Sequence, residues 1–311
     1  NDKSCDLRSI YLKYAILSMD IENWYHLDYF KGKECDQSYS MLDGLDSYLD
    51  IIDSNNIPSS FFALGELVLS IKSRLREISD SKHDLGSHGW AHKRPLNMDV
   101  DSFRKEVLKC KSELEQLLGK SITGYRAPCF SLDRERLNIL KEVGYKYDSS
   151  RIEFGDHPLY GEINMNGFKE ESPGIYRMDD FYEFQISTLA CGGKQIPVSG
   201  GGYLRIFPWF LMNKLLKKYL TTDNLYVLYI HPFEFSSKNN PIFPSSISLA
   251  NKFRFSLGRG TVTKKFERVI QLLKEKGFHF TTFENLRGDL MKNKGITHED
   301  PYHSTPSNNM T

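Results

Sequence analysis

The chain has 311 residues, 40% of them apolar and 13% aromatic, which is enough for one large domain or two small ones. With 41 basic and 40 acidic residues the formal net charge is +1, so the composition does not indicate an electrostatic nucleic-acid binder. Mean hydropathy is −0.46, and no apolar run approaches the roughly 20 residues that a membrane helix needs. We therefore expect no nucleic-acid partner and no transmembrane segment.

The cysteines and the start of the chain bear on the compartment. The five cysteines are odd in number and scattered, and none forms a CxxC pair, which favours a reducing compartment over a disulfide framework or a cysteine zinc site. The first twenty residues lack the charged start, apolar core and small-residue cleavage site of a signal peptide. These observations predict a cytoplasmic protein, although the chain begins at Asn1 and a removed leader stays open.

The first half of the chain alternates short apolar runs with helical patterns. Residues 14–19 (YAILSM) have the length of a buried strand, and residues 40–55 carry apolar side chains at helical spacing up to the break at Pro58. The same reading predicts further strands at 60–64, 84–87 and 122–126, and helices at 67–78, 99–118 and 133–143, the last two closed by Gly119 and Gly144.

The second half contains a less regular region before the alternation resumes. Residues 152–195 are rich in Gly, Asp, Glu and aromatics, and we expect hairpins and long loops over the site. Gly200, Gly201 and Gly202 lack a full phosphate-binding pattern, so we interpret them as a tight turn or mobile site loop before a helix near Pro208. An apolar strand is predicted at 225–230, and a last helix and strand at 261–276 and 278–283.

Serial strand–helix units predict an α/β fold, either a parallel barrel or an open parallel sheet. No Pro/Gly/Ser-rich linker divides the chain, and no repeat is evident. We expect a leader segment (residues 1–13), one domain (14–288) and a flexible polar tail (289–311).

Two pairs of residues could bind a metal. Asp20 and Glu22 follow the first strand, and residues two apart on a strand face the same side, so both carboxylates can enter one site; an exposed turn is the alternative. His88 and His92 (HGWAH) follow a short strand, and their spacing of four would bring two imidazoles together if the segment were helical. They could instead be ordinary surface or core histidines, and the intervening glycine weakens the helical assumption.

Three further polar residues end strands. Arg126, in GYRAPCF, could hold a catalytic carboxylate by a bidentate pair, or serve a structural salt bridge. His231 ends the most apolar strand, where it could act as a general acid or be a satisfied core histidine. Asp148, in YDSS, carries a weaker signal, because Asp-Ser-Ser is common in turns.

These signals share one position. Asp20/Glu22, His88/His92, Arg126 and His231 all follow predicted strands, and parallel α/β folds place active sites at that edge of the sheet. We therefore interpret these residues as parts of one site, because four unrelated occurrences of polar residues at this edge are less probable.

Five ordered motifs carry a resemblance to the polysaccharide deacetylase family, also known as the NodB-homology or carbohydrate esterase family 4 group. The motifs are SMDIENW, SHGWAH, GYRAPCFS, YDSS and YIHPFEF, and the match covers Tyr14 to Leu286. A further segment, IPVSGGGYLRIFP, resembles the subgroup associated with bacterial exopolysaccharide and surface-glycan biosynthesis. The resemblance implies a distorted parallel (β/α) barrel of about seven units.

The resemblance also assigns roles. It makes Asp20 the general base, oriented by Arg126, and His231 the general acid, with Glu22, His88 and His92 as ligands of a divalent metal. The metal would be Zn²⁺ by default, with Co²⁺, Ni²⁺ or Mn²⁺ as alternatives. Much of the family has adjacent aspartates in its first motif, whereas one residue intervenes here and the ligand is a glutamate, so ligand geometry and metal preference stay open.

The implied reaction is hydrolysis of an N-acetyl group from an amino sugar of a bacterial O-antigen, capsule or exopolysaccharide, with an N-acetylated sugar or glycan as substrate. Two alternatives remain: a cyclic amide or ureide hydrolase on the same fold, and a catalytically inactive glycan-binding protein. Asp148 and several aromatics are candidates to contact the substrate or support the site; the aromatics are Trp24, Tyr25, Trp90, Phe130, Tyr203 and Phe233.

Overall fold

A computed structural model describes residues 12–155 and 157–293. Its main element is one sheet, in which neighbouring strands run in the order β11-β1-β2-β3-β4-β5-β8-β7-β6, with β12 also paired to β1. The strands are β1 (Lys13–Ile21), β2 (Ser60–Ala63), β3 (Asp84–Ser87), β4 (Gly124–Tyr125), β5 (Tyr147–Asp148), β6 (Lys169–Ser172), β7 (Ile175–Met178), β8 (Phe181–Phe184), β11 (Leu225–Ile230) and β12 (Phe278–Phe280). A separate hairpin consists of β9 (Thr188–Cys191) and β10 (Lys194–Pro197).

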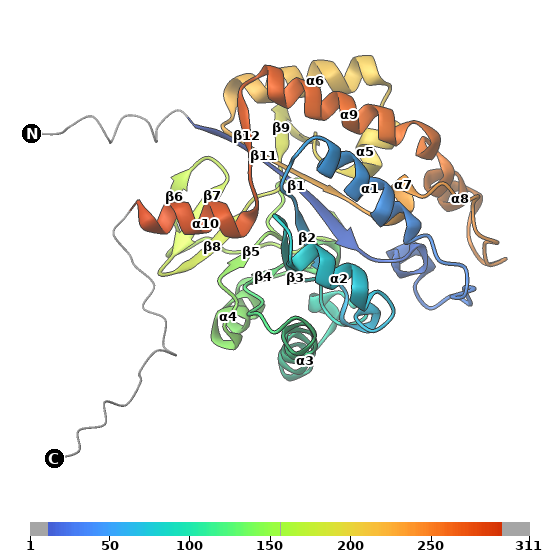
Figure 1. Ribbon diagram of the computed structural model, residues 1–311, viewed down its shortest axis with the longest axis horizontal. Coiled ribbons are helices and arrows are strands. Elements are labelled where there is room, and N and C mark those ends of the chain that lie inside the picture. Colours follow the sequence, from blue (N-terminus) through green and yellow to red (C-terminus); the bar gives the residue numbers. More distant parts are fainter. Residues whose placement is uncertain (1–11, 156, 294–311) are drawn as a thin grey trace, which may run out of the picture.

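The sheet is parallel from β11 through to β8, and at its far edge β7 pairs antiparallel with both β8 and β6. Helices surround it, as Figure 1 shows, and α10 lies at the end of β1 opposite to α7. The helices are α1 (Asp43–Ser54), α2 (Lys72–Ser79), α3 (Val100–Leu118), α4 (Arg134–Val143), α5 (Gly201–Ile206), α6 (Trp209–Thr222), α7 (Pro232–Phe235), α8 (Leu249–Ser256), α9 (Arg259–Glu275) and α10 (Phe283–Lys292). This curled, mostly parallel sheet with helices around it confirms the predicted distorted (β/α) barrel.

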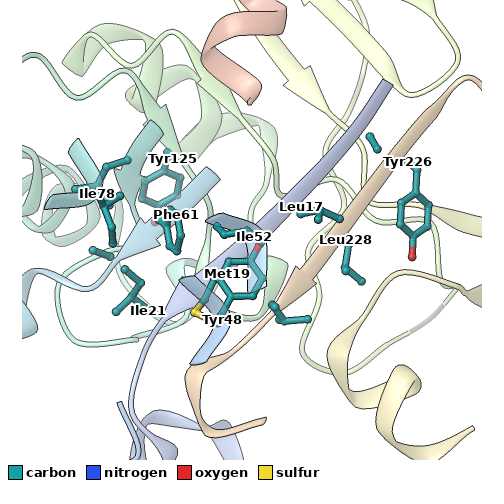
Figure 2. Close-up of a cluster of buried hydrophobic side chains, with 14 of the residues drawn as sticks. Leu17, Met19, Ile21, Tyr48, Ile52, Phe61, Ile78, Tyr125, Tyr226 and Leu228 are labelled. Carbon is teal, nitrogen blue, oxygen red and sulfur yellow. The ribbon is translucent and has the colours of Figure 1, made fainter. Parts of the chain in front are cut away.

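The alternation of side chains along β1 separates two apolar layers. Leu17, Met19 and Ile21 face the helices and pack in one buried cluster with Tyr48 and Ile52 of α1 (Figure 2). The intervening positions belong to the barrel interior, where Ile16 packs in a second cluster with side chains of β2, β5, β8, β11 and α10. The residues that continue this inward-facing series beyond Ile16 are polar, which places a hydrophilic site at one end of an apolar interior.

Serine side chains join the two sides of the barrel between β8 and β11. Ser187 follows β8, and its hydroxyl accepts from the backbone N–H of Val227 in β11 (2.9 Å). Ser199 donates from its hydroxyl to the Ser187 carbonyl (2.7 Å), and its own carbonyl accepts from the N–H of Tyr229 (2.9 Å). These bonds satisfy backbone groups of β11 that would otherwise face an unpaired edge.

Several predicted elements match closely and others need correction. The strands at 84–87 and 225–230 are confirmed, and α3 and α4 end at Gly119 and Gly144, both in the left-handed conformation. The helix predicted at 67–78 begins only at Lys72, and the strand predicted at 278–283 ends at Phe280 before α10. The expected flexible tail is described only as far as residue 293, where α10 has just ended; the remainder, with residues 1–11 of the expected leader, lies outside the described residues.

Two predictions for the irregular region were wrong in part. Residues 152–195 do form hairpins, and His157, Leu159 and Tyr160 line the cavity at the polar end of the barrel as expected, but β6, β7 and β8 extend the main sheet. The predicted glycine turn is the start of a helix, since Gly201 and Gly202 are the first two residues of α5. Within the described residues, no helix is both long enough and apolar enough to cross a membrane.

Candidate metal and active site

The polar end of the barrel lies where the parallel strands finish. Asp20 is the penultimate residue of β1 and Glu22 follows the strand directly, so both carboxylates belong to the inward-facing series. Both are almost fully buried, with exposed fractions of 3% and 1%. Buried carboxylates at this depth require cationic or metal partners, and the neighbouring strands supply such groups.

Three of the predicted residues form a compact cluster. The ligand atoms of Glu22, His88 and His92 all lie within 4.8 Å of one another. His88 follows β3 and donates from Nδ1 to the backbone oxygen of Arg126 (2.9 Å), which leaves Nε2 for a ligand. Burial lowers the pKa of His88 to about 4, so its ring is neutral at physiological pH, the state that binds metals.

His88 and His92 are brought together by a loop, and the helical assumption was wrong. Their ring centroids are 5.3 Å apart, but Gly89 has a φ of +80° and His92 a φ of +52°, both in the left-handed region. The two turns fold the segment back on itself, and the peptide groups are held by Gly65 N donating to Gly89 O (2.9 Å). Gly89 therefore suits a backbone reversal that a side chain would strain.

The donor set fits a divalent cation. Glu22 Oε2 lies 2.8 Å from His92 Nε2, yet it is buried and makes no hydrogen bond of acceptable geometry. Burial alone would raise the pKa of Glu22, but the rings of His92, His231 and His88 hold it well below its ordinary value. An ionised carboxylate with an unsatisfied oxygen beside two imidazoles is the oxygen and nitrogen set that Zn²⁺ and related ions accept.

Arg126 fixes the second carboxylate. Its Nη1 donates to Asp20 Oδ1 (2.8 Å) and to the hydroxyl of Ser18 (2.8 Å), while Nε and Nη2 donate to the carbonyl and hydroxyl of Ser149 (both 3.1 Å). The guanidinium is fully buried inside the barrel, 4.3 Å from the ring centroid of Phe62. The contact to Asp20 is therefore a single-atom ion pair whose geometry is set by strands β1 and β5, and not the bidentate pair that we expected.

His231 approaches the cluster from the end of β11. Its Nε2 lies 3.5 Å from Glu22 Oε1, and its Nδ1 lies 3.4 Å from Oε2 of Glu234. Glu234 is itself buried and paired with Arg205 of α5 through a 2.8 Å contact to Nε. Burial would lower the pKa of His231, but the Glu234 hydrogen bond and the carboxylates of Glu22, Glu234 and Asp20 raise it to about 9. The imidazole is thus protonated at neutral pH and can donate a proton.

These groups line a cavity of about 160 Å³ that opens between the loops after the strands. Other side chains from several loops and from β11 complete the lining: Leu27, Asp28, Tyr29, Ala127, Cys129, Phe130, His157, Leu159, Tyr160, Tyr229 and Arg254. Burial raises the pKa of the Cys129 thiol to about 12, so this thiol is protonated at neutral pH.

Of the aromatic residues and Asp148 that we predicted to contact the substrate or support the site, only one lines the cavity. Phe130 lines it, but Trp24 is fully buried beside Phe30 and Phe255 and cannot stack on a substrate. Trp90 and Tyr203 are half-buried outside the cavity, Trp90 beneath the ammonium of Lys109 and Tyr203 against Phe154 and Phe207. Asp148 is buried next to Glu183, Tyr25 is half-buried outside the cavity, and Phe233 is buried and stacks on Phe255.

Two supporting groups were not predicted. The contact between Glu234 and His231 could have been predicted from the sequence. Glu234 stands three residues after His231 in YIHPFEF, so one helical turn brings the two side chains together. Ser18 and Ser149, which hold Arg126, had no sequence signal beyond their place next to the motifs. Serine is too common at strand ends for its spacing to reveal a partner 108 residues away, as for Ser18, or 23 residues away, as for Ser149.

Comparison with known proteins matches two parts of the chain to family profiles. Residues 36–147 match the profile described as polysaccharide deacetylase, and residues 149–287 match a domain of unknown function, DUF3473. A peptidoglycan deacetylase of Helicobacter pylori is 27% identical over 120 residues, which cover 39% of this chain and 41% of the relative. The chain thus matches less than half the length of that protein.

Solved structures share the fold. A Mycobacterium smegmatis protein provisionally described as a polysaccharide deacetylase is 16% identical, with a TM-score of 0.57 over 95% of each chain. A carbohydrate esterase family 4 pseudoenzyme from Bacillus anthracis is 13% identical, with a TM-score of 0.51 over 89% of this chain and 66% of that chain. The profile, the relative and the fold agree with the resemblance carried by the motifs. The chain contains a polysaccharide deacetylase domain of the NodB-homology or carbohydrate esterase family 4 type, matched over residues 36–147.

Proposed function

We propose that this chain is a metal-dependent hydrolase that removes the N-acetyl group from an amino sugar. The observation that carries the proposal is the buried cluster of Glu22, His88 and His92, with Asp20 and protonated His231 lining the same cavity. The relative from Helicobacter pylori is named a peptidoglycan deacetylase, which supports an acetylated glycan as the class of substrate.

Glu22, His88 and His92 would hold the ion, with Zn²⁺ as the first candidate. When bound, it would polarise the acetamido carbonyl and make a water molecule more acidic. His88 suits this role because its Nδ1 is already committed to the Arg126 carbonyl, and its ring is neutral. The glutamate side chain is longer than that of aspartate, and its two oxygens reach His92 (2.8 Å) in one loop and His231 (3.5 Å) at the end of β11.

Asp20 and His231 would divide the proton transfers. Asp20, fixed by Arg126, accepts the proton of the attacking water. His231, held protonated by Glu234, donates a proton to the nitrogen of the departing amine. The products are a free amino sugar and acetate, and the proton balance closes because one group accepts as the other donates.

We further propose bacterial surface-glycan biosynthesis as the setting, on the strength of the IPVSGGGYLRIFP segment, which includes Arg205 of the His231 support. A reducing, cytoplasmic compartment is consistent with unpaired thiols at Cys35, Cys110, Cys129 and Cys191. Deleting the gene and analysing the host glycan tests the setting: an unchanged acetylation pattern would refute it, and recovery of the protein from outside the cytoplasm would refute the compartment.

An inactive glycan-binding protein is the competing function, because the fold is shared with a described pseudoenzyme. The two are separated by incubating the zinc-loaded full chain with N-acetylated sugars and oligosaccharides. The proposal predicts acetate and free amine in equal amounts, and loss of both after a chelator. Binding of these sugars without any acetate would support the inactive protein instead.

A further inference from the structure

The charges of the chain are unevenly distributed along the sequence. Residues 184–266 contain eleven Lys and Arg but only two acids, Asp223 and Glu234, whereas the whole chain has 41 and 40. Glu234 is buried in its pair with Arg205. The segment is therefore strongly basic where it meets solvent, and the opposite charge is carried by the remainder of the chain.

The same segment carries five of the nine exposed large apolar side chains among the described residues. Ile242 is 90% exposed, Leu249 82%, Phe210 77%, Phe253 65% and Ile206 39%. Both exposed phenylalanines belong to this group, and a soluble protein rarely exposes several large apolar side chains close together without a partner.

Hydrogen bonds join the elements that present these side chains. Arg205 at the end of α5 donates to the carbonyls of Arg254, Phe255 and Leu257 in and after α8. Asn240, in the loop before α8, donates to Ser256 (2.7 Å). The junction of α5 and α6, the loop 237–248 and α8 thus form one surface.

This surface adjoins the mouth of the catalytic cavity. Arg254 of α8 lines the cavity, next to the exposed Phe253. On the other flank, Gly200 bridges to Tyr229 near the end of β11, which fixes the start of α5 at the same edge of the barrel. Figure 1 shows α8 and α7 at the end of the molecule where β1 finishes.

We propose that this surface docks on an anionic lipid bilayer and that the substrate is presented from that membrane. It comprises five apolar and three basic side chains, and is called the basic apolar face; its residues are Ile206, Phe210, Ile242, Leu249, Phe253, Lys238, Lys252 and Arg254. Exposed Phe, Leu and Ile can enter the interface between headgroups and acyl chains, while Lys and Arg are attracted to acidic headgroups.

An anionic bilayer fits better than a second copy of the chain. Two copies meeting through this face would bring like charges together, whereas an anionic membrane complements both the charge and the apolar tips. Docking would leave the cavity mouth beside the membrane surface, where a lipid-linked N-acetylated sugar is held. The membrane contact stands independently, but the lipid-linked substrate rests on the proposed deacetylase function.

The full chain would be sedimented with vesicles of phosphatidylcholine, with and without phosphatidylglycerol. We expect binding only to the anionic vesicles, weakened by salt, and a loss of about tenfold or more in affinity for Leu249→Ser with Phe253→Ser. The matched control, Leu69→Ser with Leu108→Ser, removes two exposed leucines on α3 and the loop before α2, and should bind like the wild type.

Absence of binding to anionic vesicles, or an equal loss in the control, would overturn the docking surface. A wild-type dimer in analytical ultracentrifugation that the Leu249/Phe253 variant dissociates would show that a second copy covers the face, and would overturn it too.

Acetate release separates the two proposals. On a soluble N-acetylated sugar the Leu249/Phe253 variant should equal the wild type, while on a lipid-linked sugar in anionic vesicles it should be about tenfold slower or worse. Equal rates on the lipid-linked sugar would overturn membrane presentation. No release from any sugar by either protein would instead reject the deacetylase proposal and leave vesicle binding to be judged by sedimentation.

Discussion

At the scale of single residues, the metal cluster makes the simplest prediction. His88→Ala or His92→Ala removes one of three ligands, so bound metal should fall from one equivalent to a small fraction, together with activity. Elemental analysis of the purified variants measures this. His279→Ala, which removes an exposed histidine of β12, is the control and should keep full metal. A His88→Ala protein that retains one equivalent would show that the ligand assignment is wrong.

His231 and Glu234 make a prediction about pH. The carboxylate of Glu234 helps to hold the pKa of His231 at about 9, and the proposed reaction needs the protonated ring. Activity on amides should therefore fall as pH rises through that value. In Glu234→Gln the negative charge is gone, so the fall should begin at lower pH. The pH profile of kcat measures the shift, and an unmoved basic limb would count against His231 as the acid.

A complementary measurement compares leaving groups. His231→Ala should lose about 10²-fold or more in kcat on an N-acetyl sugar, because the amine cannot leave unprotonated. An activated acetyl ester needs no proton on its leaving group and should lose much less. Equal losses on both substrates would contradict the assignment.

At the scale of elements, α5 depends on a glycine. A Cβ on Gly201 would lie 1.8 Å from Glu234 Oε2, whereas a Cβ on Gly202 would have no atom within 4 Å. Gly201→Ala should therefore displace the Glu234 side chain, cost roughly 1–3 kcal/mol of stability as overpacking does, and reduce turnover. Gly202→Ala should fold at least as well, since alanine favours the helix by about 0.5–1 kcal/mol. Thermal unfolding and acetate release measure both effects, and equal behaviour of the two variants would refute this reading of α5.

Strands β5 and β8 contain a buried acid pair that affects stability. Asp148 and Glu183 are direct neighbours, and Glu183 Oε1 accepts from the backbone N–H groups of Ser150 and Arg151. Burial raises the pKa of Asp148 to about 6 and that of Glu183 well above its ordinary value. The folded state therefore binds protons more tightly than the unfolded chain, and the stabilisation is lost as pH rises above about 4 through the folded pKa values.

Glu183→Gln removes that dependence while keeping the shape and the accepted hydrogen bonds. The amide of the new glutamine can also donate a hydrogen bond to Asp148, which in the wild type would require a proton on one of the two carboxyl groups. The free energy of unfolding should then vary less between acidic and neutral pH and should exceed that of the wild type at neutral pH. Denaturant unfolding at several pH values tests this, with the more exposed Glu153→Gln as control. If the unfolding free energy of the variant depended on pH as steeply as that of the wild type, the buried Asp148–Glu183 pair would not be the source of the dependence.

Local signals explain which elements the sequence could predict. Apolar periodicity and the closing Gly119 and Gly144 located α3 and α4, and six apolar residues located β11. The start of α5 was not predictable, because Gly201 is required by an oxygen of Glu234 more than thirty residues away. The same limit applies to the site: the parallel strands could be expected to bring its six main residues to one edge, but the Arg205–Glu234 and Ser149–Arg126 contacts depend on packing between distant segments.

At the scale of the whole molecule, the two ends of the barrel differ in polarity. Its interior is apolar and is covered at one end by Phe283 and Leu286 of α10, which leaves the polar site at the other end. The basic apolar face borders that open end, so substrate access and the proposed membrane contact lie on the same side. The two family profiles meet between Tyr147 and Ser149, yet residues from both build the cavity, so the proposed activity would need the whole barrel.

Asp20 tests the central claim most directly, because it is assigned to accept the proton of the attacking water and is not one of the three metal ligands. The measurement is acetate release from an N-acetylated sugar by wild type and Asp20→Asn, each with its metal content determined. The account predicts that the variant keeps one equivalent of metal, since Glu22, His88 and His92 are intact, and loses about 10²–10⁴-fold in kcat. A metal-loaded Asp20→Asn protein that releases acetate at the wild-type rate would contradict the account.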